Sequence, residues 1–193
     1  MSYDIYLKEP ASGEMIQFDT PHIMTGGTFA AIYDERTGQF HKMPITDARL
    51  NITYNYSSYY YSAAENDERF LVTDENGKQI NGGIRGIYGK FGYESIAMLQ
   101  DLIDRITSDF KSDGDWITTK REVTRYYDDH GTEIDIFESI YMHSNLHKKI
   151  VTEEIYEGVN DDYWAETAGN AIKPLFQLLA FAHLRPDGIW DGD

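Results

Sequence analysis

The chain has 193 residues, 41% of them hydrophobic and 14% aromatic, and its 33 acidic residues against 17 Lys and Arg give a formal net charge of −16. This length and apolar content fit a single domain, residues 1–193, with a core of its own. The charge repels phosphate backbones and anionic lipid, which disfavours direct nucleic-acid binding and favours a basic protein partner.

The absence of cysteine and of a signal-like segment bears on the compartment in which the protein is expected. The chain contains no cysteine, so it has no disulfide, thiolate nucleophile or thiolate metal ligand, which fits a reducing compartment. Its first residues lack the basic start and apolar run of a secretory signal, and the longest apolar stretch, residues 175–184, is interrupted by Gln177 and His183. We therefore expect a cytoplasmic protein that does not enter a membrane.

Alternating apolar and polar residues in the first half of the chain predict β-hairpins. Two hairpins are predicted over residues 3–18 and 28–43, each with a turn rich in Gly, Asp, Ser or Pro. A third is predicted around Asn76 and Gly77, because this pair favours a tight two-residue turn.

Residues 50–56 alternate as well and predict a strand with one apolar and one polar face. The polar face consists of Asn51, Thr53 and Asn55. The three consecutive tyrosines at 59–61 cannot share one side of a strand, so some of their rings are expected at the surface.

Two segments have the spacing of amphipathic helices. Residues 94–110 place Leu99, Ile103 and Ile106 on one apolar stripe, and residues 163–184 do the same with Leu175 and Leu178, among others. Pro lacks an amide hydrogen, so the Pro at 174 is expected to kink the second helix or to open its second half.

Residues 111–160 carry few apolar positions and are interpreted as an inserted elaboration of the domain. A charged hairpin is predicted over 116–136, a short helix over 137–148 and a strand over 150–156. The predicted fold class is therefore α+β: an antiparallel sheet of meandering hairpins, with the two main helices packed against it.

The glycine-rich run at residues 82–92 precedes the first main helix, where backbone amides attract anions. Its spacing matches neither a Walker loop nor a dinucleotide fingerprint, because Gly89 and Lys90 lack both the earlier glycine and the following hydroxyl residue. A tight, closely packed turn is the favoured interpretation, and an anion site is the alternative.

A set of polar side chains beside several aromatic residues is the candidate small-ligand site. The set comprises Asn51, Thr53, Asn55, Arg85, Tyr88, Lys90 and Asn170. The alternative, preferred on general grounds, is that these side chains satisfy backbone groups at sheet edges and helix ends.

Metal binding and catalysis have weaker support. His143 and His147 would align on one side of the predicted short helix as metal ligands, but such a pair on a charged helix usually faces solvent. No nucleophile elbow is present, and no carboxylate pair stands out among 33 acids, so enzymatic activity is not supported. We expect no cofactor.

Several segments resemble a family of small proteins from phages and prophages of Gram-positive bacteria. They are residues 2–5 (Ser-Tyr-Asp-Ile), 50–56, 83–90, 162–164 and 185–190, which cover both ends and the centre of the chain. The resemblance is weakest over residues 111–160. It implies a phage setting in the host cytoplasm and no catalytic residues.

Three classes of function follow, in this order. The first is an acidic protein-binding module that inhibits a basic host partner, such as a defence or nucleic-acid-binding protein. The second is a small-ligand binding or sequestering protein, and the third an enzyme of unrecognised type. The sequence leaves homo-oligomerisation open.

Overall fold

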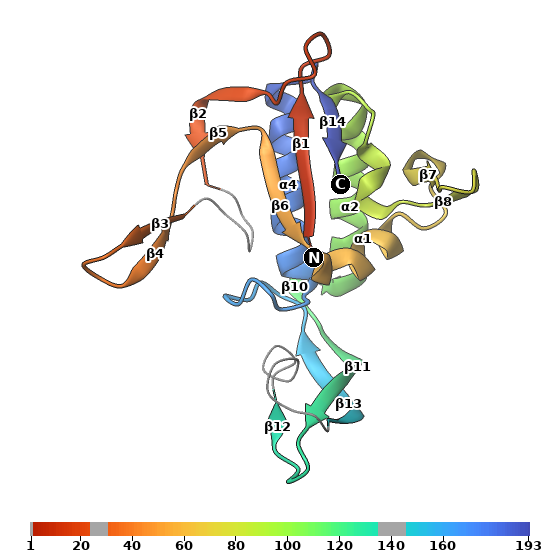
Figure 1. Ribbon diagram of the computed structural model, residues 1–193. Coiled ribbons are helices and arrows are strands. Elements are labelled where there is room, and N and C mark those ends of the chain that lie inside the picture. The colour runs from red at the N-terminus through yellow and green to blue at the C-terminus, as the bar shows by residue number, and fades with distance from the viewer. Residues whose placement is uncertain (1, 24–30, 135–145) are drawn as a thin grey trace.

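The computed structural model describes residues 2–23, 31–134 and 146–193 (Figure 1). The helices in these ranges are α1 (Ser57–Ala63), α2 (Gly92–Phe110) and α4 (Ala168–Leu184), with the 3-10 helices η1 (Tyr54–Tyr56), η2 (Glu68–Phe70) and η3 (Gly83–Ile87). The strands are β1 (Ser2–Lys8), β2 (Gln17–His22), β3 (Ala31–Asp34), β4 (Gln39–Lys42), β5 (Ile45–Asp47), β6 (Arg49–Thr53), β7 (Leu71–Thr73), β8 (Gln79–Asn81), β9 (Lys111–Ser112), β10 (Asp115–Trp116), β11 (Thr118–Tyr127), β12 (Glu133–Ile134), β13 (His147–Tyr156) and β14 (Ile189–Gly192).

The central sheet joins the first strand of the chain to the last. Its antiparallel order is β14-β1-β6, with Leu7 opposite Trp190 and Ile5 opposite Leu50. Alternate residues of β1 are buried, as the sequence pattern predicts, and they form the sheet side of the core. Both ends of the described chain therefore lie together in one sheet (Figure 1).

Helices α2 and α4 pack against each other and supply the other side of the core. Leu99 and Ile106 of α2 and Leu175 and Leu178 of α4 are buried, which confirms both apolar stripes. The second helix begins at Ala168, later than expected, because the Thr167 side chain caps it by accepting the Asn170 amide at 3.2 Å.

The segment after α4 folds back onto the body. Trp190 is fully buried, and its indole nitrogen donates to the Ser95 hydroxyl of α2 at 2.7 Å. Pro174 lies inside α4, so the helix continues through it.

The α+β class is confirmed, but the hairpins do not join into one meander. Strands β3–β4, β7–β8 and β9–β10 form separate two-stranded ladders, and the expected hairpin over 3–18 is reduced to one bridge, Lys8 to Met15. Strand β2 instead pairs with β5 at Gln17 and His22. Alternation shows which faces of a strand are apolar but not which strand it pairs with, so these partners were not predictable.

The predicted strand over 50–56 ends early. The Thr53 hydroxyl accepts the Asn55 amide at 3.2 Å and starts η1, after which the three tyrosines continue into α1. Tyr59 and Tyr60 are buried and Tyr61 reaches the surface. In the helix, two of the three consecutive tyrosines face the core and the third faces solvent, which one side of a strand could not provide.

The β11–β13 ribbon, residues 118–127 paired with 147–156 and flanked by β12, projects from the body (Figure 1). Most of the predicted short helix over 137–148 lies outside the described residues, and His147 and Lys148 belong to a strand instead. Whether the ribbon is dispensable stays a prediction. No helix in the described ranges combines the length and the apolar character needed to span a bilayer.

Candidate functional site

Most residues of the predicted ligand site take part in internal hydrogen bonds. The buried Asn51 side chain donates to the Ser2 hydroxyl at 2.8 Å and to Asp4 Oδ1 at 3.1 Å. The Thr53 amide donates to the Tyr163 hydroxyl at 2.9 Å, and the Asn55 side chain donates to the Trp164 carbonyl at 2.9 Å. These bonds join β6 and η1 to the loop before α4.

Asn170 holds the same loop from the other side. Its side-chain oxygen accepts the Asn160 amide at 3.0 Å, and its nitrogen donates to the carbonyls of Asp162 and Ala165. Thr53, Asn55 and Asn170 therefore bind groups of the loop before α4, whereas the Asn51 side chain binds β1.

Arg85 lies among aromatic rings at the end of η3. Its Nη2 donates to the Tyr54 hydroxyl at 2.6 Å, its Nε donates to the main-chain oxygen of Asp193 at 3.0 Å, and its guanidinium lies 4.9 Å from the Tyr3 ring centroid. The nearby Tyr88 hydroxyl is buried and has no hydrogen-bond partner within the described part of the chain, and burial raises the pKa of this phenol. Neither Arg85 nor Tyr88 lines either of the two larger cavities described below.

The glycine-rich run is packed against the body. The amides of Gly92 and Tyr93, which an anion would need, donate to the carbonyls of Gly188 and Pro186 at 2.8 and 3.0 Å. A Cβ on Gly92 would lie 2.5 Å from the Arg185 carbonyl oxygen, so only glycine fits there. Lys90 contributes to this packing through its main-chain carbonyl, which accepts the Trp190 amide at 2.9 Å. These contacts favour the packed-turn interpretation over the anion site.

The predicted histidine pair is only partly described. His147 lies on β13, where its Nε2 is 3.0 Å from Asp129 Oδ1, and His143 lies outside the described residues. Within the described ranges, no three histidine or carboxylate side chains gather in a metal-binding arrangement.

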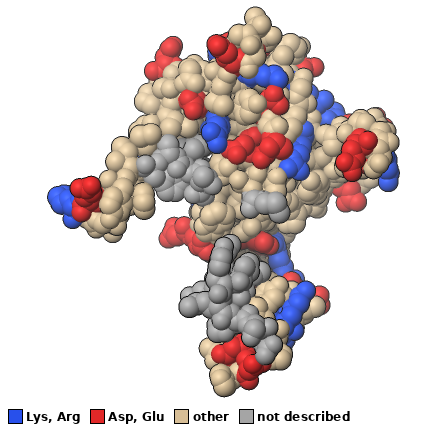
Figure 2. Space-filling model, in the orientation of Figure 1, with Lys and Arg blue, Asp and Glu red and all other residues tan. Residues whose placement is uncertain are grey.

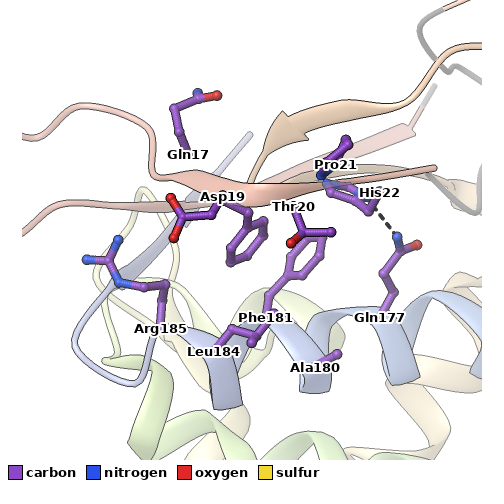
Figure 3. A pocket seen from close by; sticks show the side chains of 11 residues that line it. Gln17, Asp19, Thr20, Pro21, His22, Gln177, Ala180, Phe181, Leu184 and Arg185 are labelled. Atoms are coloured by element: carbon purple, nitrogen blue, oxygen red, sulfur yellow. Dashed lines mark hydrogen bonds between the residues drawn. The ribbon is translucent and has the colours of Figure 1, made fainter.

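A first concave surface, the β2–α4 cleft, lies between strand β2 and helix α4 and measures about 600 Å³ (Figure 3). It is lined by Gln17, Phe18, Asp19, Thr20, Pro21, His22, Gln177, Ala180, Phe181, Leu184 and Arg185. The rings of Phe18 and Phe181 lie 4.9 Å apart, and the exposed Leu184 extends the apolar surface toward solvent.

Most polar groups of this cleft bind inside the chain. His22 Nδ1 accepts from the Gln177 side chain at 3.0 Å, drawn in Figure 3, while its Nε2 donates to the Asp47 carbonyl at 2.7 Å. Arg185 forms ion pairs with Glu9 and Asp187, both at 2.8 Å. The cleft thus combines apolar side chains with polar groups that are largely held by internal bonds.

A second concave surface, the acidic groove, lies between the β11–β13 ribbon and the loop before α4 and measures about 790 Å³. Figure 2 shows acidic side chains at this junction of body and ribbon. The groove is lined by five carboxylates and one guanidinium, together with neutral residues. The charged residues are Glu122, Glu153, Glu154, Asp162, Glu166 and Arg125.

The charges in the acidic groove are far from balanced. Arg125 already pairs with Glu153 at 2.6 Å and with Glu133 at 3.2 Å. Glu154 pairs with Lys120 at 3.6 Å, whereas Glu122, Asp162 and Glu166 form no ion pair among the described residues, and each is exposed. The groove therefore holds an excess of negative charge on a concave surface.

The groove was not predicted, because its carboxylates come from segments far apart in the sequence. The register that sets Glu122 opposite Thr152 and Lys120 opposite Glu154 brings two strands together, and the loop at 160–167 closes the surface. The only local signals were the acidic pairs at 153–154 and 161–162.

Comparisons with known proteins return no match: no family model fits the chain, and neither the curated proteins nor the solved structures contain a significant relative. The resemblance to phage proteins stays a prediction, and the function is argued from the surfaces described above.

Proposed function

We propose that this protein binds a basic segment of a partner protein in the acidic groove. The observation that supports the proposal is that five carboxylates line this groove, Glu122 and Glu154 from the outer face of the ribbon and Glu153 from its inner face among them, against a single lining guanidinium that is already paired twice. A Lys- or Arg-rich segment would supply the missing positive charge. The net charge of −16 would speed the encounter with such a partner from a distance.

The rim of the acidic groove adds an aromatic contact. Tyr156 lines the groove and is exposed, and Trp164 in the adjoining loop is exposed as well. Guanidinium and ammonium groups are attracted to the faces of such rings. Nucleic-acid-binding proteins commonly carry the Lys- and Arg-rich surfaces that such a groove would attract. We therefore propose as partner a nucleic-acid-binding or defence protein of the host, in the phage setting that the resemblance implies.

The direct test uses a fluorescently labelled Lys/Arg-rich peptide and measures its anisotropy at low and high salt. We expect binding at low salt that weakens steeply as the Debye length falls below about 10 Å. The groove variant neutralises four carboxylates: Glu122→Gln, Glu154→Gln, Asp162→Asn and Glu166→Gln. If each contributes about 0.3–0.5 kcal/mol, the affinity should fall about tenfold or more.

A matched control variant neutralises four exposed carboxylates outside the groove, three without an ion pair among the described residues and one, Asp187, that has an ion pair as Glu154 does. They are Glu14→Gln, Glu35→Gln, Glu75→Gln and Asp187→Asn. Both variants have the same net charge, so equal losses of affinity would mean that the diffuse field acts without the groove. Binding that does not change with salt would contradict the proposal.

Small-ligand binding and catalysis stay the alternatives that the sequence leaves open. Apart from the Tyr88 hydroxyl, the polar residues predicted for a ligand are engaged in internal hydrogen bonds, and no observation here favours either function over protein binding.

A further inference from the structure

The β3–β4 arm, residues 31–42, is a two-stranded hairpin that projects from the body (Figure 1). Its strands pair with each other and pack substantially against no other helix or strand of the described chain. Isolated two-stranded hairpins are at best marginally stable in water. Contact with another surface would therefore stabilise the arm.

The arm exposes large apolar side chains on both faces. Phe40 is 67% exposed and lies opposite Tyr33, with their ring centroids 5.0 Å apart, while Ile32 is 57% exposed on the other face. A group of exposed apolar residues of this kind marks an interaction surface rather than a solvated turn.

The β2–α4 cleft of the same chain offers apolar side chains and a charge that complement those of the arm. Its walls mix apolar and polar side chains: Phe18 lies against the buried Phe181 with ring centroids 4.9 Å apart, and Leu184 is exposed at the open side. Charge is complementary as well: Arg36, 85% exposed at the arm's turn, has only a 3.7 Å pair with Asp34 of the same arm, and Asp19 is an exposed cleft residue without an ion pair among the described residues.

The arm is attached beside this cleft but points away from it. Only Met43 and Pro44 separate β4 from β5, and β5 pairs with β2, which forms one wall of the cleft. Pro44 restricts the backbone at this root, because its φ is fixed and the residue before it is held extended. The projecting arm is thus better placed for the cleft of a second molecule than for its own.

We infer that two copies of this chain associate by seating the β3–β4 arm of each in the β2–α4 cleft of the other. Twofold symmetry uses both arms and both clefts and closes the assembly, whereas head-to-tail contact would leave an arm and a cleft exposed. This surface is separate from the acidic groove, so the inference does not depend on the proposed function.

The first measurement is the molar mass in solution by light scattering on a sizing column, across protein and salt concentrations. We expect a dimer whose fraction rises with protein concentration. It should also rise with salt, because salt screens the repulsion between two copies of charge −16. Peptide binding in the acidic groove has the opposite salt dependence, so failure of one proposal is distinguishable from failure of the other.

Two variants and their mixture test the arm-in-cleft contact. Phe40→Asp removes the arm contact and Ala180→Arg fills the cleft from an exposed helical position, and each should weaken dimerisation at least about thirtyfold, as loss of an aromatic hot spot does. An equimolar mixture should form dimers again, because the intact arm of one variant fits the intact cleft of the other. Matched controls are Phe176→Arg, exposed on the same helix outside the cleft, and Ile150→Asp, exposed on the other ribbon.

Three outcomes would overturn the inference: a wild-type chain that stays monomeric at the highest attainable concentration, a Phe40→Asp variant that still dimerises, or a mixture that stays monomeric. Circular dichroism shows whether each variant folds. If either unfolds, Ile32→Asp on the arm and Leu184→Lys in the cleft replace them, because both positions are exposed.

Discussion

Arg121 of β11 forms an ion pair with Glu157, whose carboxylate is wholly buried at the start of α4. The same carboxylate accepts the Tyr59 hydroxyl at 2.7 Å and the Ala168 amide at 3.0 Å, so it also caps the helix. Burial, with the bond to Glu157, raises the pKa of Tyr59. This pair joins the β11–β13 ribbon to the body and thereby sets one wall of the acidic groove.

Replacing Arg121 by Ala should lower the free energy of unfolding by about 3–5 kcal/mol, because it leaves a buried carboxylate without its cation. Urea denaturation measures the change. The control is Lys120→Ala, whose exposed pair with Glu154 spans 3.6 Å and should be worth about 0–1 kcal/mol. Equal losses of unfolding free energy in the two variants would show that the buried ion pair stabilises the fold no more than an exposed one.

The two helical stripes should be sensitive to truncation. Leu99→Ala and Leu178→Ala, both at fully buried positions, should each cost about 2–5 kcal/mol through lost transfer free energy and the cavity left behind. Chemical denaturation is the measurement, and the exposed Gln100→Ala on α2 should stay within about 0.5 kcal/mol. A change below that limit at both leucines would contradict the core described here.

The outer part of the ribbon should be removable. Replacing residues 124–150 by an Asn-Gly turn keeps the Val123–Val151 pair as the last of the ladder and retains Arg121 and Glu157. We expect cooperative thermal unfolding to persist. Removing residues 113–156 instead takes away Arg121 and should destabilise the protein more; equal stability of the two deletions would argue against the anchoring role of the ion pair.

Removing the Ser95 hydroxyl should isolate one buried hydrogen bond. Ser95→Ala leaves the Trp190 indole N–H without its acceptor, which should cost about 1–3 kcal/mol. Denaturation followed by tryptophan fluorescence reports the loss. Ser108→Ala is the matched control, because this exposed serine on the same helix likewise donates to the carbonyl three residues earlier, and it should change little.

The acid sensitivity of the fold should depend in part on Asp67. Hydrogen bonds from Arg69 and then Arg105 hold the pKa of this carboxyl well below its usual range. Because the folded-state pKa is the lower one, Asp67 stabilises the fold above the unfolded pKa of about 3.9 and loses this effect as the pH falls further. Asp67→Asn should therefore lower stability at pH 7 and flatten the loss between about pH 4 and 2.

The exposed Asp109→Asn variant is the control for this pH profile and should keep the wild-type slope. The measurement is the unfolding free energy of each variant and of wild type at several pH values. An Asp67→Asn profile parallel to wild type would mean that other carboxyls account for the acid sensitivity.

The sequence alone determined the features that depend on neighbouring residues. The stripe from Leu99 to Ile106 predicted α2, and the turns at 34–38 and 74–77 predicted the β3–β4 and β7–β8 hairpins, because helical spacing and turn residues act over a few positions. Acidity and the lack of cysteine are likewise properties of composition.

Tertiary structure decided which distant segments meet. Pairing of Leu7 with Trp190, burial of Glu157 beside Arg121, and the gathering of Glu122, Glu154 and others into the acidic groove all join residues far apart in the chain. These contacts depend on packing summed over the whole chain, in which local propensity is a minor part. For the same reason the side-chain amides of Asn55 and Asn170, proposed as ligand contacts, turned out to hold a loop: the partner of Asn55 lies more than a hundred residues away, and that of Asn170 lies around a turn that no local pattern shows.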